Sequence, residues 1–151
     1  MEKFVAYFSA EWGLSDELPI YAGGLGILAA DILKQSSDSN FPLVGIGLFY
    51  HEGFFRQKVD KNGNQIEENF SITPQEANLE EVIDPETGKP LFIEIGFPKE
   101  PAAVKVWKKQ IGNTPLFLLD AQIPINKDFE QKYTAHLYEG EWSPFIEQEI
   151  L

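Results

Sequence analysis

The sequence has no cysteine and a single methionine among its 151 residues. Without cysteine the protein forms no disulfides and offers no thiolate ligands to a metal, so we expect a cytoplasmic protein. Long hydrophobic runs are also missing, because the longest, residues 43–50, is too short to cross a bilayer. The first residues carry neither the basic nor the apolar region of a secretory signal peptide.

Basic side chains are scarce: 12 Lys and Arg stand against 24 Asp and Glu, which gives a formal net charge of −12. Such a surface repels phosphate backbones and anionic lipids, so nucleic acid and membrane are not expected partners. Histidine occurs only at His51 and His136, without metal-site spacing or a third partner for a catalytic triad. We expect no metal and no catalytic residue in this chain, and we expect His51 and Arg56 at the surface.

What is present is a hydrophobic fraction of 43%, enough for one core, arranged in a βαβ pattern. Residues 4–8 predict a buried strand. Residues 43–50 predict a second strand that is apolar on both faces, as is typical of a parallel sheet. Between them, residues 25–37 predict a helix whose apolar side chains recur at helical spacing, at Leu25, Leu28, Ala29, Ile32 and Leu33. The predicted fold class is α/β, a partial Rossmann-like parallel sheet with helices.

The middle of the chain favours antiparallel hairpins. Asn62-Gly63 between two strand-like segments is a strong hairpin signal, and residues 84–90 form a second turn cluster. We expect residues 54–114 to be a hairpin-rich insertion, in which residues 71–83 are either a short helix or a loop. Residues 116–120 then predict a strand that returns to the sheet.

Ser143-Pro144, followed by apolar and acidic residues, predicts a helix that runs to the last residue. Because no cap or polar tail follows, we expect residues 1–151 to be an incomplete lobe of a larger protein. Such a lobe would leave apolar faces uncovered, so self-association through those faces is a further expectation.

The sharpest chemical feature is the run Gly23-Gly24-Leu25-Gly26 at the predicted helix start. Glycines here permit a turn with positive φ and the close approach of a ligand. The first N–H groups of the helix, aided by its dipole, suit a phosphate or a developing anion. A helix start that simply needs a tight turn explains the same glycines, so the run by itself leaves both interpretations open.

The motifs around this run make it more specific. They are, in order, Ser9-Ala10-Glu11-Trp12-Gly13, Pro19-Ile20-Tyr21-Ala22, Gly45-Ile46-Gly47-Leu48-Phe49-Tyr50 and Gly53-Phe54-Phe55-Arg56-Gln57. In this order and spacing, residues 4–58 resemble the N-terminal region of α-glucan phosphorylases, and most of all the shorter bacterial and archaeal kind. The resemblance returns weakly at residues 115–124, 135–138 and 146–151, while residues 60–114 carry no matching motif.

The resemblance implies a two-lobed GT-B glycosyltransferase of carbohydrate metabolism, with this chain in the N-terminal lobe and the C-terminal cofactor lobe absent. It implies a retaining glycogen or maltodextrin phosphorylase, which cleaves terminal α-1,4-glucosyl units with inorganic phosphate to give glucose 1-phosphate. Its partners would be an α-1,4-glucan and phosphate. Its cofactor would be pyridoxal phosphate, whose anchoring lysine is not in this chain. With half the cleft missing, we expect these residues alone to be inactive.

By the same resemblance, Gly23, Gly24 and Leu25 would donate backbone N–H groups at the phosphate and glucosyl site. Donors placed there stabilise charge that develops in the transition state. Glu11 matches a family acid near this loop. We expect it to orient the loop by binding helix-end amides rather than to act as a base, and an exposed loop position is the alternative.

Tyr50, Glu52 and Gln57 match family positions that border the cleft, although a core position at a strand end would equally explain Tyr50. The sequence departs from the family at residues 137–141, Leu-Tyr-Glu-Gly-Glu, where family members often have Leu-Tyr-Gly-Gly-Asp.

Two other functions are kept as alternatives. A glycogen- or starch-synthase-like lobe, which uses a nucleotide sugar, shares the fold, but such enzymes place a lysine two residues before the glycine pair, where this chain has Tyr21. A non-catalytic carbohydrate-binding module would need a closed sheet of its own and an aromatic platform.

Overall fold

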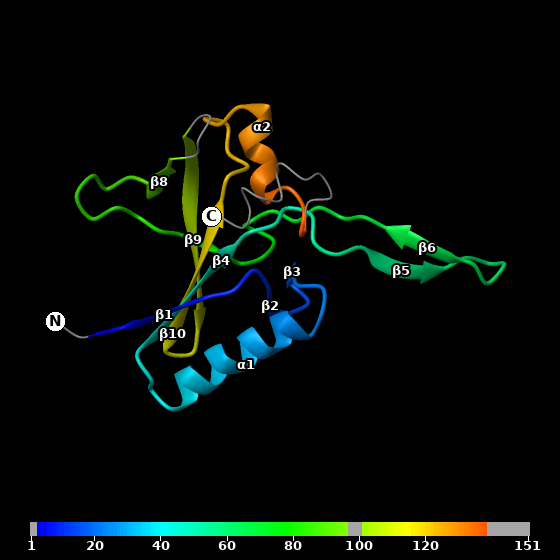
Figure 1. The fold of residues 1–151 in the computed structure, drawn as a ribbon, viewed down its shortest axis with the longest axis horizontal. Coiled ribbons are helices and arrows are strands. Elements are labelled where there is room, and N and C mark those ends of the chain that lie inside the picture. The colour runs from blue at the N-terminus through cyan, green and yellow to red at the C-terminus, as the bar shows by residue number, and fades with distance from the viewer. Residues whose placement is uncertain (1–2, 97–100, 139–151) are drawn as a thin grey trace.

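The computed structural model describes residues 3–96 and 101–138. They form a mixed α/β fold around a six-stranded sheet with the order β1-β4-β10-β9-β7, in which β8 also pairs with β9 (Figure 1). Its strands are β1 Val5–Phe8, β4 Leu43–Leu48, β7 Glu80–Glu81, β8 Phe92–Ile95, β9 Ala102–Ile111 and β10 Thr114–Asp120.

Two small antiparallel pairs lie outside this sheet. They are β2 (Trp12–Ser15) with β3 (Leu18–Ile20), and β5 (Arg56–Val59) with β6 (Gln65–Glu68). The described helices are α1 (Gly24–Asp38), the short α2 (Asp128–Gln131) and the 3₁₀-helix η1 (Lys132–Thr134). None of the helices in residues 3–96 and 101–138 is both long and apolar enough to span a bilayer.

The predicted βαβ unit is confirmed. β1 and β4 pair in parallel, with Val5 opposite Leu43, and α1 connects them. On its other side, β4 pairs in parallel with β10, where Leu116 lies opposite Gly45. β4 is therefore an inner strand of the sheet, which is why its sequence lacks a polar face.

The opposite half of the sheet is antiparallel. β9 and β10 form a hairpin through Gly112, whose φ of +55° is the left-handed conformation that a tight turn needs. The turn is tied to the end of α1, because the Asn113 N–H donates to the Ser37 hydroxyl over 2.8 Å. Residues 54–114, predicted to be an insertion, thus include strands of the main sheet. β9 was not predicted to be a strand of the main sheet, although its partner β10 is the next strand along the chain.

The predicted hairpin at Asn62-Gly63 is confirmed as β5–β6, with Gly63 at a φ of +85°. The Asp60 carboxylate stabilises the turn by accepting the N–H groups of Asn62 and Asn64. The hairpin projects away from the sheet (Figure 1). Residues 71–83 form a loop that leads into the two-residue strand β7, so of the two predicted forms the loop is present.

The predicted helix is confirmed as α1, but its buried face differs from the predicted stripe. Ala29 and Leu33 are buried as expected, whereas Leu25 and Leu28 are 49% and 56% exposed. The buried residues are Gly26, Ala29, Ala30, Leu33, Ser36 and Ser37. This face is mostly small, which lets the helix lie close to β2 and the sheet, and the two leucines turn outward as a result.

β1 was predicted to be a buried strand, and this is wrong in the described structure. Its residues are mostly exposed, and Phe4 and Phe8 show 61% and 67% of their surface to solvent. The reason is topological, since β1 pairs with β4 on one edge and has no strand on its other edge among the described residues. The expected self-association through uncovered apolar faces stays a prediction.

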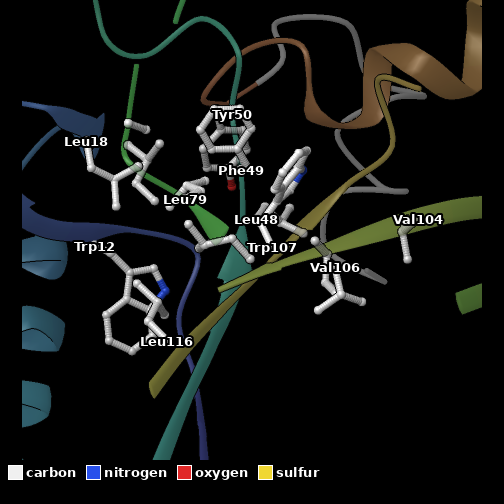
Figure 2. Close-up of a cluster of buried hydrophobic side chains, with 14 of the residues drawn as sticks. Trp12, Leu18, Leu48, Phe49, Tyr50, Leu79, Val104, Val106, Trp107 and Leu116 are labelled. Carbon is white, nitrogen blue, oxygen red and sulfur yellow. The ribbon is translucent and has the colours of Figure 1, made fainter. Parts of the chain in front are cut away.

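The buried cluster takes side chains from α1, the β2–β3 pair, the sheet, the loop at residues 72–79 and η1 (Figure 2). Trp12 is fully buried against β4, where it occupies the space above two glycines. A Cβ added at Gly45 would lie 2.9 Å from the Trp12 ring, and one at Gly47 would lie 2.2 Å from Trp12 Nε1. Gly45 and Gly47 therefore leave the space that the Trp12 indole occupies.

The helix start predicted at residue 143 lies outside the described residues.

Candidate functional site

Two of the residues singled out in the sequence, Glu11 and Tyr50, lie where the parallel strands end, beside Asp120, which was not singled out. Glu11 follows β1, Tyr50 follows β4, and Asp120 is the last residue of β10. Because the carboxyl ends of parallel strands meet at one edge of a sheet, this edge is where α/β folds place ligand sites. The glycine turn at the start of α1 lies at the same end, because its N–H groups at Gly23 and Gly26 donate to the Glu11 carboxylate.

Glu11 anchors the glycine turn. Its side-chain Oε2 accepts backbone N–H groups from Ala22 at 3.1 Å, Gly23 at 3.3 Å and Gly26 at 3.1 Å. Its other oxygen, Oε1, accepts the hydroxyl of Tyr138. Glu11 is buried, with 3% of its surface exposed, so the alternative of an exposed loop residue does not hold in this structure.

The charge of Glu11 is stabilised by these contacts. Burial by itself would raise the pKa of the Glu11 carboxyl, since a charged group is disfavoured away from water. The hydrogen bonds from Tyr138 and from the amides of Ala22, Gly23 and Gly26 outweigh burial, and the pKa lies below its ordinary value. The group is therefore a carboxylate at neutral pH, held against the positive end of the α1 dipole.

The glycines of the turn differ in what they permit. Gly26 is required by packing, because a Cβ there would lie 2.5 Å from the Tyr21 Cβ and 3.0 Å from Glu11 Oε2. At Gly23 and Gly24 an added Cβ would meet no atom within 4 Å. The expectation that these glycines supply a positive φ is wrong, since Gly23 is extended at φ −158° and Gly24 lies in the helix. The fold of the described residues gives no steric reason for glycine at 23 and 24.

The N–H groups of Gly24 and Leu25 are the open donors of the turn. Among the described residues, none accepts a hydrogen bond from either group, and both residues are exposed. The N–H of Gly23 is occupied by Glu11 instead. Of the three donors predicted from the sequence, two are available to a molecule outside the chain and one is bound internally.

An open pocket of about 550 Å³ lies beside the turn, lined by Asp16, Pro19, Tyr21, Ala22, Phe54, Phe55, Arg56 and Phe70. The pocket brings together the motifs at residues 19–22 and 53–57, which are far apart in the sequence. Gly53 makes this possible, because a Cβ there would lie 2.2 Å from the Pro19 carbonyl oxygen. Arg56 is exposed, as predicted, and its guanidinium lies 4.2 Å from the centre of the Phe70 ring.

The remaining predicted site residues have different environments. Tyr50 is 1% exposed and belongs to the core. Glu52 is half-buried and contacts a neighbouring segment, with its carboxylate 3.0 Å from His136 Nδ1. Gln57 is exposed on β5 and does not line the pocket. Their predicted role at a cleft stays a prediction.

A polar network at the end of β10 was missed from the sequence. The Asp120 carboxylate is buried, with Oδ1 2.9 Å from His51 Nε2 and Oδ2 accepting the Trp107 indole N–H at 3.0 Å. Oδ1 also accepts the backbone N–H of Gln122. The expectation that His51 lies at the surface is wrong, because its partner Asp120 draws the ring inward. Their separation of 69 residues left no sequence signal.

This network borders a second cavity of about 330 Å³, whose walls are mainly apolar and include Pro74, Phe92, Ile123, Pro124 and Ile125. Across residues 3–96 and 101–138, no group of three or more His, Asp or Glu side chains is placed to hold a metal ion. The family departure at residues 139–141 lies outside the described residues.

Comparison with known proteins found no matching family model. The chain is 40% identical over 150 residues to maltodextrin phosphorylase of Thermococcus litoralis. It is 42% identical over 148 residues to glycogen phosphorylase of Mycobacterium tuberculosis, and 35% identical over 150 residues to that of Aquifex aeolicus. These matches cover 99%, 97% and 99% of the chain but 18%, 17% and 22% of the relatives, so the chain spans about a fifth of their length.

Proposed function

Because the chain is homologous to a segment of glycogen and maltodextrin phosphorylases, we propose that it forms part of the N-terminal lobe of an α-glucan phosphorylase. The observation that carries this proposal is the 40% identity over 150 residues, a span that includes residues 60–114, which carry no motif of the family. The reaction would be phosphorolysis of terminal α-1,4-glucosyl units of a glucan to glucose 1-phosphate. The architecture would be that of a GT-B lobe, with the parallel strands β1, β4 and β10 as its Rossmann-like part.

In this proposal the glycine turn contributes hydrogen-bond donors to the phosphate and glucosyl site. The open N–H groups of Gly24 and Leu25 stand at the positive end of α1, where an oxyanion is stabilised by both the donors and the dipole. The missing steric need for glycine at 23 and 24 supports the same role, because the space left by the absent side chains suits close approach of a ligand.

The chain's own residues would bind and orient rather than transfer protons. Amide donors that are fixed before the reaction stabilise negative charge as it develops, and they do so without reorganisation. Arg56, which lines the pocket beside the turn, adds an exposed cation there. Tyr50, Glu52 and Gln57 would support this edge of the cleft from behind or beside it.

Pyridoxal phosphate, the cofactor that the resemblance implies, would supply its phosphate group to the reaction when bound. The lysines whose contacts are defined do not fit an anchoring role. Lys58 pairs with Glu68, Lys105 pairs with Glu81, and Lys109 donates to the Ala77 carbonyl. No step of the proposal goes through the cofactor.

We expect these 151 residues, as a single purified chain, to produce no glucose 1-phosphate from maltodextrin and inorganic phosphate. Donors for one part of the substrate are present, but a complete cleft is not formed by the described residues. The measurement is an enzyme-coupled assay for glucose 1-phosphate, with heat-denatured protein as the blank. Turnover above that blank would contradict the expectation.

Inorganic phosphate is expected to shift the ¹H–¹⁵N signals of Gly24 and Leu25 in a saturable way, with a dissociation constant of about 1 mM, or about 4 kcal/mol. Gly24→Ala should keep the fold, because no atom lies within 4 Å of the added Cβ. It should weaken phosphate binding about tenfold, since the methyl group stands in the path of the ligand.

Sodium chloride at matched ionic strength is the control for general charge screening. A phosphate response located away from residues 23–26, or an unchanged affinity in Gly24→Ala, would overturn the assignment of the turn as the phosphate site.

A further inference from the structure

We propose that Tyr138 is a positioning residue for the glycine turn, because its hydroxyl fixes the Glu11 carboxylate on one set of amides and so keeps another set open. The closed set is Ala22, Gly23 and Gly26, and the open set is Gly24 and Leu25. The inference rests on the proposed function in one respect, namely that the open amides receive an oxyanion. The contact itself is independent of that function.

The geometry divides the two carboxylate oxygens between two tasks. Oε2 accepts three N–H groups of the turn, while Oε1 accepts the Tyr138 hydroxyl. A carboxylate held at one oxygen only keeps more freedom to rotate about its last bond than one held at both oxygens. A donor on the far oxygen removes this freedom.

The residues directly before Tyr138 are held by backbone contacts with the segment that follows β4. The Glu52 N–H donates to the Ala135 carbonyl over 2.7 Å, and the Leu137 N–H donates to the Glu52 carbonyl over 3.0 Å. Tyr138 adopts a φ of +56°, which is unfavourable for a bulky residue and persists only where its surroundings impose it. Glu52 therefore connects to the glycine turn through backbone contacts and Tyr138.

The orientation of the Glu11 carboxylate matters because this anion and an incoming oxyanion can compete for the same N–H groups. The carboxylate is an anion of the chain's own at the helix start, and an incoming oxyanion needs the same kind of donor. While Glu11 is fixed on Ala22, Gly23 and Gly26, it does not occupy the N–H groups of Gly24 and Leu25. Released from Tyr138, it would reach more of the turn and compete with an external anion.

The groups that face the Glu11 carboxylate are the Tyr138 hydroxyl, the three amides and the neighbouring Tyr21, whose Cβ packs at Gly26. Among the described residues, Glu11 takes part in no ion pair. Its pKa is below the ordinary value, so its contribution to stability is present above the ordinary carboxyl range and is lost as the pH falls through the folded-state pKa. Removing the Tyr138 hydroxyl takes away one of the causes that lower this pKa.

The test is Tyr138→Phe, followed by ¹H–¹⁵N NMR between neutral and acidic pH. The amide signals of Ala22, Gly23 and Gly26 should report one titration, and its midpoint should move to higher pH in the variant. Tyr7→Phe is the matched control, since Tyr7 packs edge-on against Trp12 on another element and should leave the midpoint unchanged. Glu11→Gln should abolish the titration at all three amides, which identifies its source.

Phosphate affinity is measured in the same samples at neutral pH, and it should fall about three- to tenfold in Tyr138→Phe. A midpoint that does not move contradicts the positioning role, whatever phosphate does. If the midpoint moves but neither protein binds phosphate, the result supports the Tyr138–Glu11 contact and overturns the proposed phosphate site. A moved midpoint with unchanged phosphate affinity contradicts the claim that Tyr138 keeps the Gly24 and Leu25 amides open.

Discussion

Asp120→Ala is expected to lower the free energy of unfolding by about 2–3 kcal/mol, toward the upper end of the range for leaving a buried donor without its acceptor. Asp120 is 2% exposed and accepts hydrogen bonds from the Trp107 indole and the Gln122 backbone, while His51 lies at 2.9 Å. In the alanine variant the buried Trp107 indole N–H loses its acceptor, whereas the Gln122 N–H keeps the Thr134 hydroxyl as a second one. Urea denaturation followed by tryptophan fluorescence measures the change, because Trp107 is part of the network.

Asp128→Ala is the matched control, since Asp128 is an exposed carboxylate and its loss should change the unfolding free energy by less than about 1 kcal/mol. Asp120→Asn keeps the shape of the side chain but places an NH₂ group against one of the existing donors. It should fall between the alanine variant and the native protein. A loss below about 1 kcal/mol for Asp120→Ala would show that the network does not stabilise the fold.

Gly47→Ala is expected to cost about 3 kcal/mol, near the upper end for overpacking a well-packed core. The added Cβ would lie 2.2 Å from Trp12 Nε1 and 2.9 Å from the Ser9 backbone oxygen. Neither neighbour can move without displacing the β1–β2 connection or the indole under α1. Thermal and urea denaturation measure the loss, with Gly96→Ala as a control whose Cβ meets no atom within 4 Å.

A double-mutant cycle with Trp12→Leu separates this mechanism from a general weakening of β4. If the clash with the indole causes the loss, Gly47→Ala should cost much less in the Trp12→Leu background, because the smaller side chain leaves room. Additive effects of the two substitutions would mean that the indole is not the reason for glycine at this position.

Local features of the sequence were sufficient for several elements. The helical spacing of residues 25–37, the Asn62-Gly63 turn and the apolar run of residues 43–50 each act over a few neighbouring residues, and all three are present as predicted. The expected contact of Glu11 with helix-end amides is also found, although the resemblance to phosphorylases suggested it. The hydrogen bond from Tyr138 to Glu11 was not predicted, because 127 residues separate the two side chains.

Other predictions depended on contacts that no local pattern contains. The helix face, the exposure of β1 and the inward position of His51 were each predicted wrongly. Small residues let α1 approach the sheet closely and so decided its buried face. β1 has no strand on its outer edge among the described residues, which leaves it exposed. The buried Asp120 carboxylate decided the position of His51.

By itself the sequence determined the order of strand, helix and strand, the positions of the tight turns and the likeness to phosphorylases, because propensity, periodicity and motif spacing act over short stretches of chain. Only the tertiary structure decided which amides of the glycine turn stay open, since that depends on where one carboxylate rotates and on a tyrosine that reaches it. It also decided why β4 carries glycines, because an indole from another strand occupies the space that side chains would fill.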